Sequence, residues 1–167
     1  MNTKFFLLFL SLILLSCHSN ELQGDASQKP HSKEDWIKFR SQELKISLAE
    51  AQSQEENLSE SEPPEEIWDA SLQTESAILW RNYCATCHGV TGQLENVPEQ
   101  DPMPRKFGTF GMSMGFFFGG DKMRAGIYKA IKTGKKSDGT VLNKMPAWGE
   151  SFSKEQLWGL VFFIKDL

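Results

Sequence analysis

The stretch Cys84-Ala85-Thr86-Cys87-His88, followed by Gly89, decides which fold the chain is expected to adopt. Two cysteines three residues apart, with a histidine directly after the second, place two thiols and one imidazole on adjoining sides of one helical turn. Each thiol can form a thioether with a vinyl group of haem, and His88 can then bind the iron from one face. The spacing therefore predicts one covalently bound haem c.

A CxxC pair by itself also occurs in other kinds of site. A zinc site normally needs a second pair of ligands, and a dithiol redox motif normally lies in a βαβ unit. The sequence around Cys84 and Cys87 has neither feature, so both are weaker interpretations. A dithiol redox protein without haem is kept as an alternative.

Residues 1–17 have the pattern of an export signal. Lys4 supplies a positive charge, and a mainly apolar run follows from Phe5 to Leu15. As a helix this run would span only about half of a bilayer core, which favours a signal peptide over a transmembrane anchor. The closing tetrapeptide Leu14-Leu15-Ser16-Cys17 resembles the lipobox of bacterial lipoproteins, in which the cysteine is lipidated.

The cysteine count agrees with lipidation. If Cys17 carries lipid while Cys84 and Cys87 carry haem, none of the three cysteines is left as a reactive thiol. The alternative is a plain secretory signal cleaved near Ser16. The sequence thus predicts an exported protein, held by a lipid anchor on the periplasmic side of a bacterial membrane.

Residues 18–69 have the composition of an acidic tether, with five basic and thirteen acidic residues. Apolar residues are sparse, so much of this segment is expected to be mobile. The start signal Ser32-Lys33-Glu34-Asp35 predicts one solvated helix over about 32–56. Such a helix could dock on a partner or on the following domain, but its thin apolar stripe favours a stiff spacer.

Residues 70–167 are predicted to form an all-α domain. Leu72, Ser76, Leu79 and Tyr83 share one helical stripe that leads into the cysteine motif. A second helix is expected over 121–132, with Gly134 as its stop. A third begins with a capping box at 153–156 and is apolar to the end of the chain, so the first and last helices are expected to cross.

These features resemble the class I cytochrome c domain over residues 70–167. The motif Met145-Pro146-Ala147-Trp148-Gly149, followed by the aromatic closing helix, resembles the endings common among bacterial monohaem cytochromes c. The resemblance implies N- and C-terminal helices that cross around a covalently bound haem. Ser76 stands where the family often has glycine, which predicts a slightly wider crossing.

The second axial ligand of the iron is not fixed by the cysteine motif. The domain has no second histidine, and its methionines are Met103, Met112, Met114, Met123 and Met145. The resemblance selects Met145, which Pro146 would stiffen, and leaves Met112 or Met114 as alternatives. His–Met ligation would fill both faces of the iron, which suits electron transfer.

The resemblance also implies that a proline carbonyl accepts the other ring N–H of His88, and Pro102 or Pro104 is expected to provide it. Arg105 or Lys106 is expected to pair with a haem propionate. The stretch 107–120 contains five phenylalanines among five glycines. Its rings are expected to line the haem, and the alternative is an exposed surface for a partner or a membrane.

Basic residues gather near the end of the middle helix and in the loop after it. They are Lys129, Lys132, Lys135, Lys136 and Lys144. A basic face suits redox partners with acidic docking surfaces, whereas nucleic acid is a poor candidate for an exported domain with so small an excess charge.

The sequence thus predicts a one-electron carrier rather than an enzyme, tethered to a membrane in a respiratory chain. One alternative is a dedicated cytochrome c subunit of one membrane oxidoreductase. Another is a haem ligand sensor or peroxidase with an open sixth position.

Overall fold

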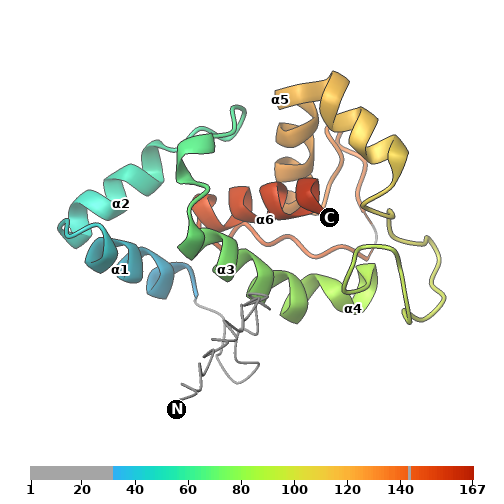
Figure 1. Cartoon of the computed structure of the whole chain (residues 1–167), viewed down its shortest axis with the longest axis horizontal. Coiled ribbons are helices and arrows are strands. Elements are labelled where there is room, and N and C mark those ends of the chain that lie inside the picture. Colours follow the sequence, from blue (N-terminus) through green and yellow to red (C-terminus); the bar gives the residue numbers. More distant parts are fainter. Residues whose placement is uncertain (1–31, 143) are drawn as a thin grey trace, which may run out of the picture.

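The computed structural model describes residues 32–142 and 144–167, and this part of the chain is helical (Figure 1). The predicted export signal and the predicted lipidation at Cys17 lie outside the described residues. The helices are α1 (Lys33–Glu43), α2 (Leu48–Asn57), α3 (Ala70–Leu79), α4 (Ala85–His88), α5 (Phe110–Thr133) and α6 (Lys154–Asp166). Within the described ranges no strand forms, which confirms the all-α prediction. None of the described helices is long and apolar enough to cross a membrane.

Helix α6 begins at the predicted capping box. The Ser153 hydroxyl accepts the backbone N–H of Gln156 at 3.0 Å, and the Gln156 side-chain oxygen accepts the backbone N–H of Ser153 at 2.9 Å. The helix is buried on several sides, with Trp158 and Leu160 both 0% exposed. It forms the centre of the core because α3, α5 and the N-terminal helices all pack around it.

Helices α3 and α6 cross at Ser76 and Gly159. A Cβ on Gly159 would lie 2.4 Å from the Ser76 Oγ and 2.8 Å from the Leu72 Cδ1, so only glycine fits at that point. The Ser76 hydroxyl donates to the Leu72 carbonyl at 2.6 Å and is therefore satisfied although it is fully buried. The glycine that permits the close approach thus lies on α6, while a wider crossing stays a prediction.

A π-helical turn, Trp80–Cys84, joins α3 to α4. Leu72, Ser76 and Leu79 are fully buried as predicted, but Tyr83 is 39% exposed. Tyr83 contacts the rings of Trp148 and Phe152 and lines the cavity described below, whereas Trp80, next to Leu79, is only 2% exposed. The stripe is therefore confirmed as far as Leu79, and Tyr83 at its end lies at the cavity.

Helices α1 and α2, with the segment as far as Asp69, form an arm that packs on the N-terminal end of α6. The Trp36 side chain is 1% exposed, and its indole N–H donates to the Glu155 carboxylate at 2.8 Å. The Glu55 carboxylate accepts the backbone N–H groups of Lys154 and Glu155, at the first turn of α6. The arm is therefore part of the folded body.

Two predictions for this segment are wrong. The chain forms two helices rather than one over about 32–56, because it turns between Leu44 and Ser47, where Lys45 has a left-handed φ of 56°. The described part is also no solvated spacer, since the arm docks on the domain. Its apolar stripe is thin because many of its contacts are made by polar groups such as Glu55.

Helix α5 starts earlier than the predicted range of 121–132. It begins at Phe110, is kinked at Gly120 (φ 47°, ψ −130°), and ends at Thr133. The predicted stop is confirmed, since Gly134 is left-handed with φ 65°. The first half was missed because its many glycines have low helix propensity.

Candidate functional site

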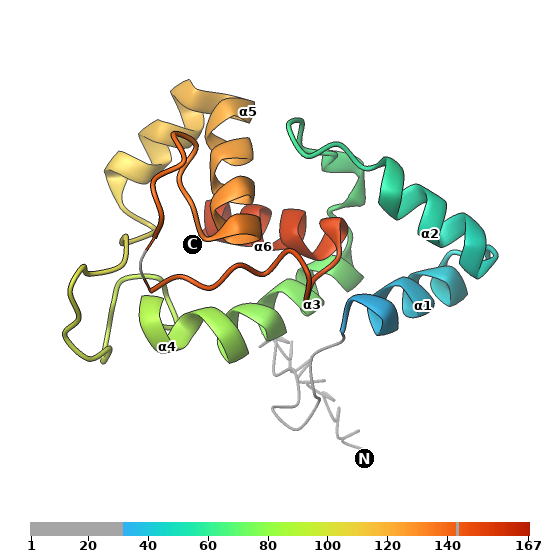
Figure 2. The same ribbon diagram turned by 180° about the vertical axis from the view of Figure 1, so that it is seen from behind.

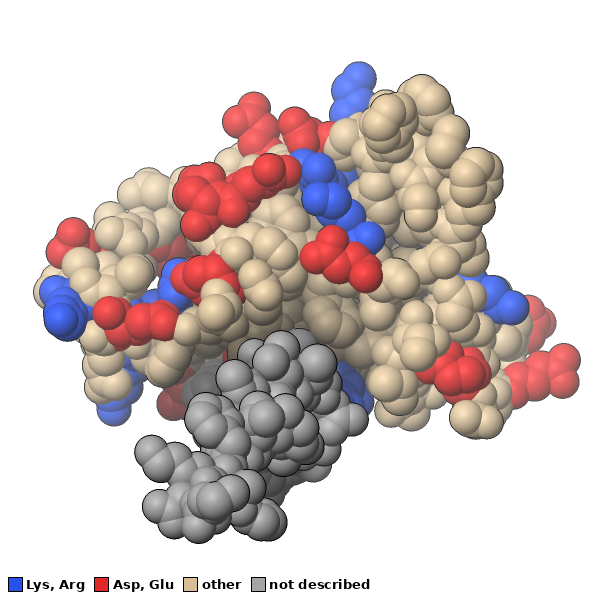
Figure 3. Space-filling view, in the orientation of Figure 1, with Lys and Arg blue, Asp and Glu red and all other residues tan. Residues whose placement is uncertain are grey.

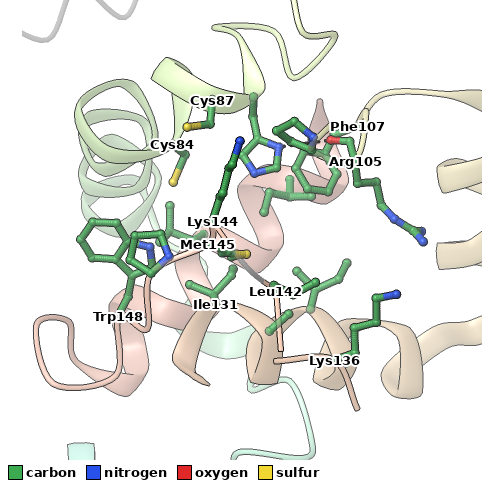
Figure 4. Close-up of a pocket in the computed structure, with 18 of the residues that line it drawn as sticks. Cys84, Cys87, Arg105, Phe107, Ile131, Lys136, Leu142, Lys144, Met145 and Trp148 are labelled. Carbon is green, nitrogen blue, oxygen red and sulfur yellow. Dashed lines mark hydrogen bonds between the residues drawn. The ribbon is translucent and has the colours of Figure 1, made fainter. Parts of the chain in front are cut away.

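A cavity of about 440 Å³ lies between α4, α5, α6 and the loop that precedes α6 (Figure 4). Its size is within the usual range for cofactor sites. Cys84, Cys87 and His88 line one wall, and Met145 enters from the loop. The rest is mainly apolar and includes Trp80, Phe107, Ile127, Ile131, Leu142, Trp148, Leu160 and Ile164. The structure thus brings together the four residues predicted to hold the haem.

The His88 ring is held by neighbours on two sides. Its Nδ1–H donates to the carbonyl of Arg105 at 3.1 Å, and the Phe107 ring lies 5.0 Å away between centroids. Burial lowers the pKa of His88, against the opposing effect of the Arg105 hydrogen bond. The imidazole is therefore favoured as the neutral ligand, with Nε2 left for a metal.

The carbonyl that accepts this hydrogen bond differs from the predicted one. It belongs to Arg105, one residue beyond Pro104, and not to Pro102 or Pro104. Both prolines line the cavity, so the prediction identified the segment that faces His88 but not the carbonyl that accepts the hydrogen bond. Which carbonyl faces the ring depends on the path of the segment, which is fixed downstream where the Phe107 N–H donates to the Gly92 carbonyl at 2.8 Å.

The loop that carries Met145 is tied to the C-terminal end of α5. The Leu142 N–H donates to the Gly134 carbonyl at 2.8 Å, and the Trp148 N–H donates to the Ile131 carbonyl at 3.0 Å. Gly134 permits this close approach, because a Cβ there would lie 2.8 Å from the Met145 carbonyl oxygen. Backbone contacts with α5 therefore place the Met145 thioether at the cavity.

The other methionines fall into two groups. Met112, Met103 and Met123 also line the cavity, whereas Met114 does not. Met112 is 5% exposed, and its sulfur lies 3.5 Å from the Arg105 Nη1. Among the predicted alternatives to Met145, the geometry therefore retains Met112.

Residues 72–164 match the family described as "Cytochrome C oxidase, cbb3-type, subunit III". The match covers more than half of the chain. The chain belongs to this family. Its members have the class I monohaem c-type cytochrome domain, so the resemblance found from the sequence is confirmed. No curated protein and no solved structure matches the chain.

The cavity fits the covalently bound haem c that this cytochrome family implies. Two thiols and a fixed imidazole stand on one wall and a thioether on the other, which are the groups that haem c requires. Burial, helped by the neighbouring Cys87, raises the pKa of the Cys84 thiol to about 12. A dithiol redox centre needs a lowered thiol pKa, so this environment argues against that alternative.

The predicted basic face of the cytochrome is only partly open. Lys132 forms an ion pair with Glu60 of the arm at 2.6 Å, and the Lys129 ammonium donates to the Ser137 carbonyl at 3.3 Å. Figure 3 shows acidic and basic side chains close together on the side of the molecule where the segment after α2 approaches α5 in Figure 1. Lys132 is therefore engaged by the arm, and a docking surface of five lysines stays a prediction.

Four cationic side chains lie at the cavity itself. Lys136 and Lys144, predicted for docking, line it together with Lys122, which the sequence analysis missed because nothing in the pattern marks it. Arg105 also lines it, whereas Lys106 does not. Of the two residues expected near a propionate, the geometry retains Arg105.

The phenylalanines of 107–120 do not share one environment. Phe107 lines the cavity and Phe116 is buried, each 8% exposed. Phe110, Phe117 and Phe118 are 82%, 79% and 75% exposed. The prediction that these rings line the haem is wrong for the last three.

Proposed function

We propose that the protein is a one-electron carrier with a single haem c. Cys84 and Cys87 form the thioether bonds, and His88 and Met145 are the axial ligands. The observation that carries the proposal is that one and the same cavity is lined by the cysteine motif on one wall and by Met145 on the other.

Haem c supplies a one-electron couple at its iron when bound. The protein supplies the surroundings that suit this task. The Arg105 carbonyl fixes the ring of His88, Met145 closes the opposite face, and the apolar lining limits the access of water. No side chain needs to act as a catalyst, because the surface and the cofactor carry the function.

The setting we infer is the periplasmic side of a bacterial membrane, within a respiratory chain. The export pattern of residues 1–17 supports this setting, and lipid on Cys17 would provide the anchor. Redox partners with acidic docking surfaces would meet the lysines beside the cavity, Lys136 and Lys144.

A dedicated subunit of one membrane oxidoreductase is the second candidate. The name of the matching family, which is that of an oxidase subunit, favours it. Purification under mild conditions separates the two candidates. A carrier purifies alone, whereas a subunit purifies with the same partners at fixed ratio.

The axial ligands are tested by optical spectra of the oxidised and reduced protein, with Met145→Ala compared with Met112→Ala. Loss of the axial thioether opens a coordination site, so reduced Met145→Ala is expected to bind carbon monoxide. The parent and Met112→Ala are expected not to bind it, although both methionines line the cavity.

Three results would contradict the proposal. Carbon monoxide binding by the parent protein would indicate an open sixth position and a ligand sensor or peroxidase. Binding by Met112→Ala alone would move the ligand to Met112. Extraction of the haem into acidic organic solvent would exclude thioether attachment.

A further inference from the structure

The first half of α5 carries an unpartnered apolar stripe. Phe110, Met114, Phe117 and Phe118 follow one another at helical spacing and are 82%, 37%, 79% and 75% exposed. The rings of Phe117 and Phe118 contact each other edge to face, with centroids 5.0 Å apart. Three phenyl rings this exposed on one helix form a patch that usually marks an interaction surface.

The stripe is separate from the haem cavity. The same helix uses Met112 and Phe116, which are 5% and 8% exposed, to pack on the core. The exposed rings do not line the cavity, so bound haem would not cover them. The helix therefore has two apolar sides, of which only one is packed within the described chain.

The charges around the stripe point to its occupant. Residues 107–120 contain no charged side chain, and Figure 3 shows an uncharged surface over the part of the molecule where the first half of α5 lies in Figure 1. In the sequence, basic residues stand at both ends of the stripe: Arg105 and Lys106 before it, and Lys122 after it, all exposed. Arg105 and Lys122 also line the haem cavity, whereas Lys106 does not. Asp121, the acidic residue nearest to the stripe in the sequence, forms an ion pair with Arg124 at 3.1 Å.

Rings without hydrogen-bonding groups, bordered by cations, suit the interface of an anionic lipid bilayer. The rings can enter the boundary of the acyl chains while the basic side chains stay at the level of the headgroups. A protein partner that recognised the same surface would find no polar group within the stripe to fix its orientation.

We propose that the stripe of Phe110, Met114, Phe117 and Phe118 seats the protein on an anionic lipid bilayer. The segment between Cys17 and Ser32 can reach about 50 Å when extended, so a lipid on Cys17 leaves this face free to touch the membrane. The inference depends on the proposed export only because the protein must reach a membrane. Binding of the stripe to the bilayer does not require a lipid anchor. Seating would fix the orientation of the haem cavity relative to the membrane.

The test uses the haem-containing chain from His18 onward, which keeps every residue that the structure describes. Neither a lipid on Cys17 nor the apolar run of Phe5 to Leu15 can then contribute to the binding. Protein is sedimented with vesicles of phosphatidylcholine mixed with phosphatidylglycerol, and with vesicles of phosphatidylcholine alone. The protein is expected to bind the mixed vesicles more tightly, and added salt should weaken that binding.

The decisive variant replaces Phe110, Phe117 and Phe118 by serine. Its partition onto mixed vesicles is expected to fall at least about tenfold, because three phenyl rings no longer leave water. The matched control replaces Leu44 and Leu48, each 47% exposed on the arm, by serine and should bind like the parent.

Failure of the parent to bind mixed vesicles would overturn the inference, as would equal binding by the parent and the triple variant. A parent that self-associates without vesicles, with a monomeric triple variant, would assign the stripe to a second copy of the chain instead. Optical spectra of the same samples report the haem separately. A protein that does not bind vesicles is therefore distinguished from one that does not bind haem as the proposed function requires.

Discussion

The two ends of the α3–α6 helix pair are covered by different kinds of contact. The reverse view shows the arm of α1 and α2 near the N-terminal end of α6, with α4 and the first half of α5 towards the other end (Figure 2). The haem cavity lies at that other end, where it is lined by residues of α4, α5 and α6. Ionisable groups hold the arm. The Arg40 guanidinium lies 2.9 Å from the Glu155 carboxylate, and the Glu55 carboxylate accepts the backbone N–H groups of Lys154 and Glu155. Backbone hydrogen bonds and apolar side chains hold the loop that carries Met145.

This difference has a physical consequence. Burial raises the pKa of Glu155, against the opposing effect of Arg40, and burial likewise raises the pKa of Glu55 in spite of its backbone donors. The attachment of the arm should therefore respond to pH and salt, whereas the Met145 loop should not. Variants at the two ends test this contrast.

The largest effect is expected for Trp36→Ala. Removing this buried ring should lower the free energy of unfolding by about 3 kcal/mol, because it leaves a cavity and removes one hydrogen-bond donor of Glu155. Urea unfolding measures the loss, and the haem spectrum should not change. The control is Leu44→Ala, which is 47% exposed and should change stability by less than about 0.5 kcal/mol. Equal losses in both variants would mean that the arm is not docked.

At the cavity end, Gly134→Ala should destabilise by about 1–3 kcal/mol, because a positive φ strains alanine. Its Cβ would also displace the Met145 carbonyl, so the reduced variant should bind carbon monoxide. Gly139→Ala is the matched control, since Gly139 has φ 88° but nothing within 4 Å of a Cβ. It should share the strain and leave the Met145 ligand in place. Carbon monoxide binding by both variants, or by neither, would refute the role of Gly134.

The pH dependence of the arm should be smaller and has a defined sign. A carboxyl group whose pKa is raised on folding favours the folded state when protonated, so its contribution to stability grows as the pH falls from neutral and is lost as the pH rises. Glu55→Gln should therefore flatten the dependence of unfolding free energy on pH in this direction. The exposed neighbour variant Glu56→Gln should keep the parent's profile. A Glu55→Gln profile that matches the parent's would exclude this source.

The smallest effect is expected for Lys132→Ser, which removes the ion pair with Glu60. Both side chains are partly exposed, so the loss should be about 0.2–1 kcal/mol at low salt and should vanish at high salt. Lys135→Ser, on the exposed turn after α5, is the control and should have little effect. A loss that persists at high salt would mean that Lys132 stabilises the domain through packing.

Local sequence patterns predicted the parts of the molecule that local contacts form. The capping box at Ser153 joins groups three residues apart, and Gly134 ends α5 where a left-handed residue is required. The cysteine motif predicted the haem-binding cytochrome fold, since its groups lie within one helical turn. The π-helical turn Trp80–Cys84 leaves no such mark in the sequence.

Contacts between distant residues escaped the sequence because they have no periodicity. Trp36 meets Glu155 across 119 residues, and the hydrogen bond that orients His88 comes from a backbone carbonyl that any residue could supply. The sequence offered an exposed surface over 107–120 as an alternative, but the glycines of this stretch did not predict the helix that forms it. A helix that is apolar on two sides does not reveal which side is packed.

The sequence by itself determined the cofactor class and the helical fold, because a short motif and helix signals suffice for both. Only the tertiary structure decided that the acidic arm docks on α6, that the Arg105 carbonyl supports His88, and that three phenylalanines of α5 remain exposed. The reason is that docking depends on contacts between elements that are far apart in the sequence. Composition and spacing describe each surface alone and do not say which two surfaces pack against each other.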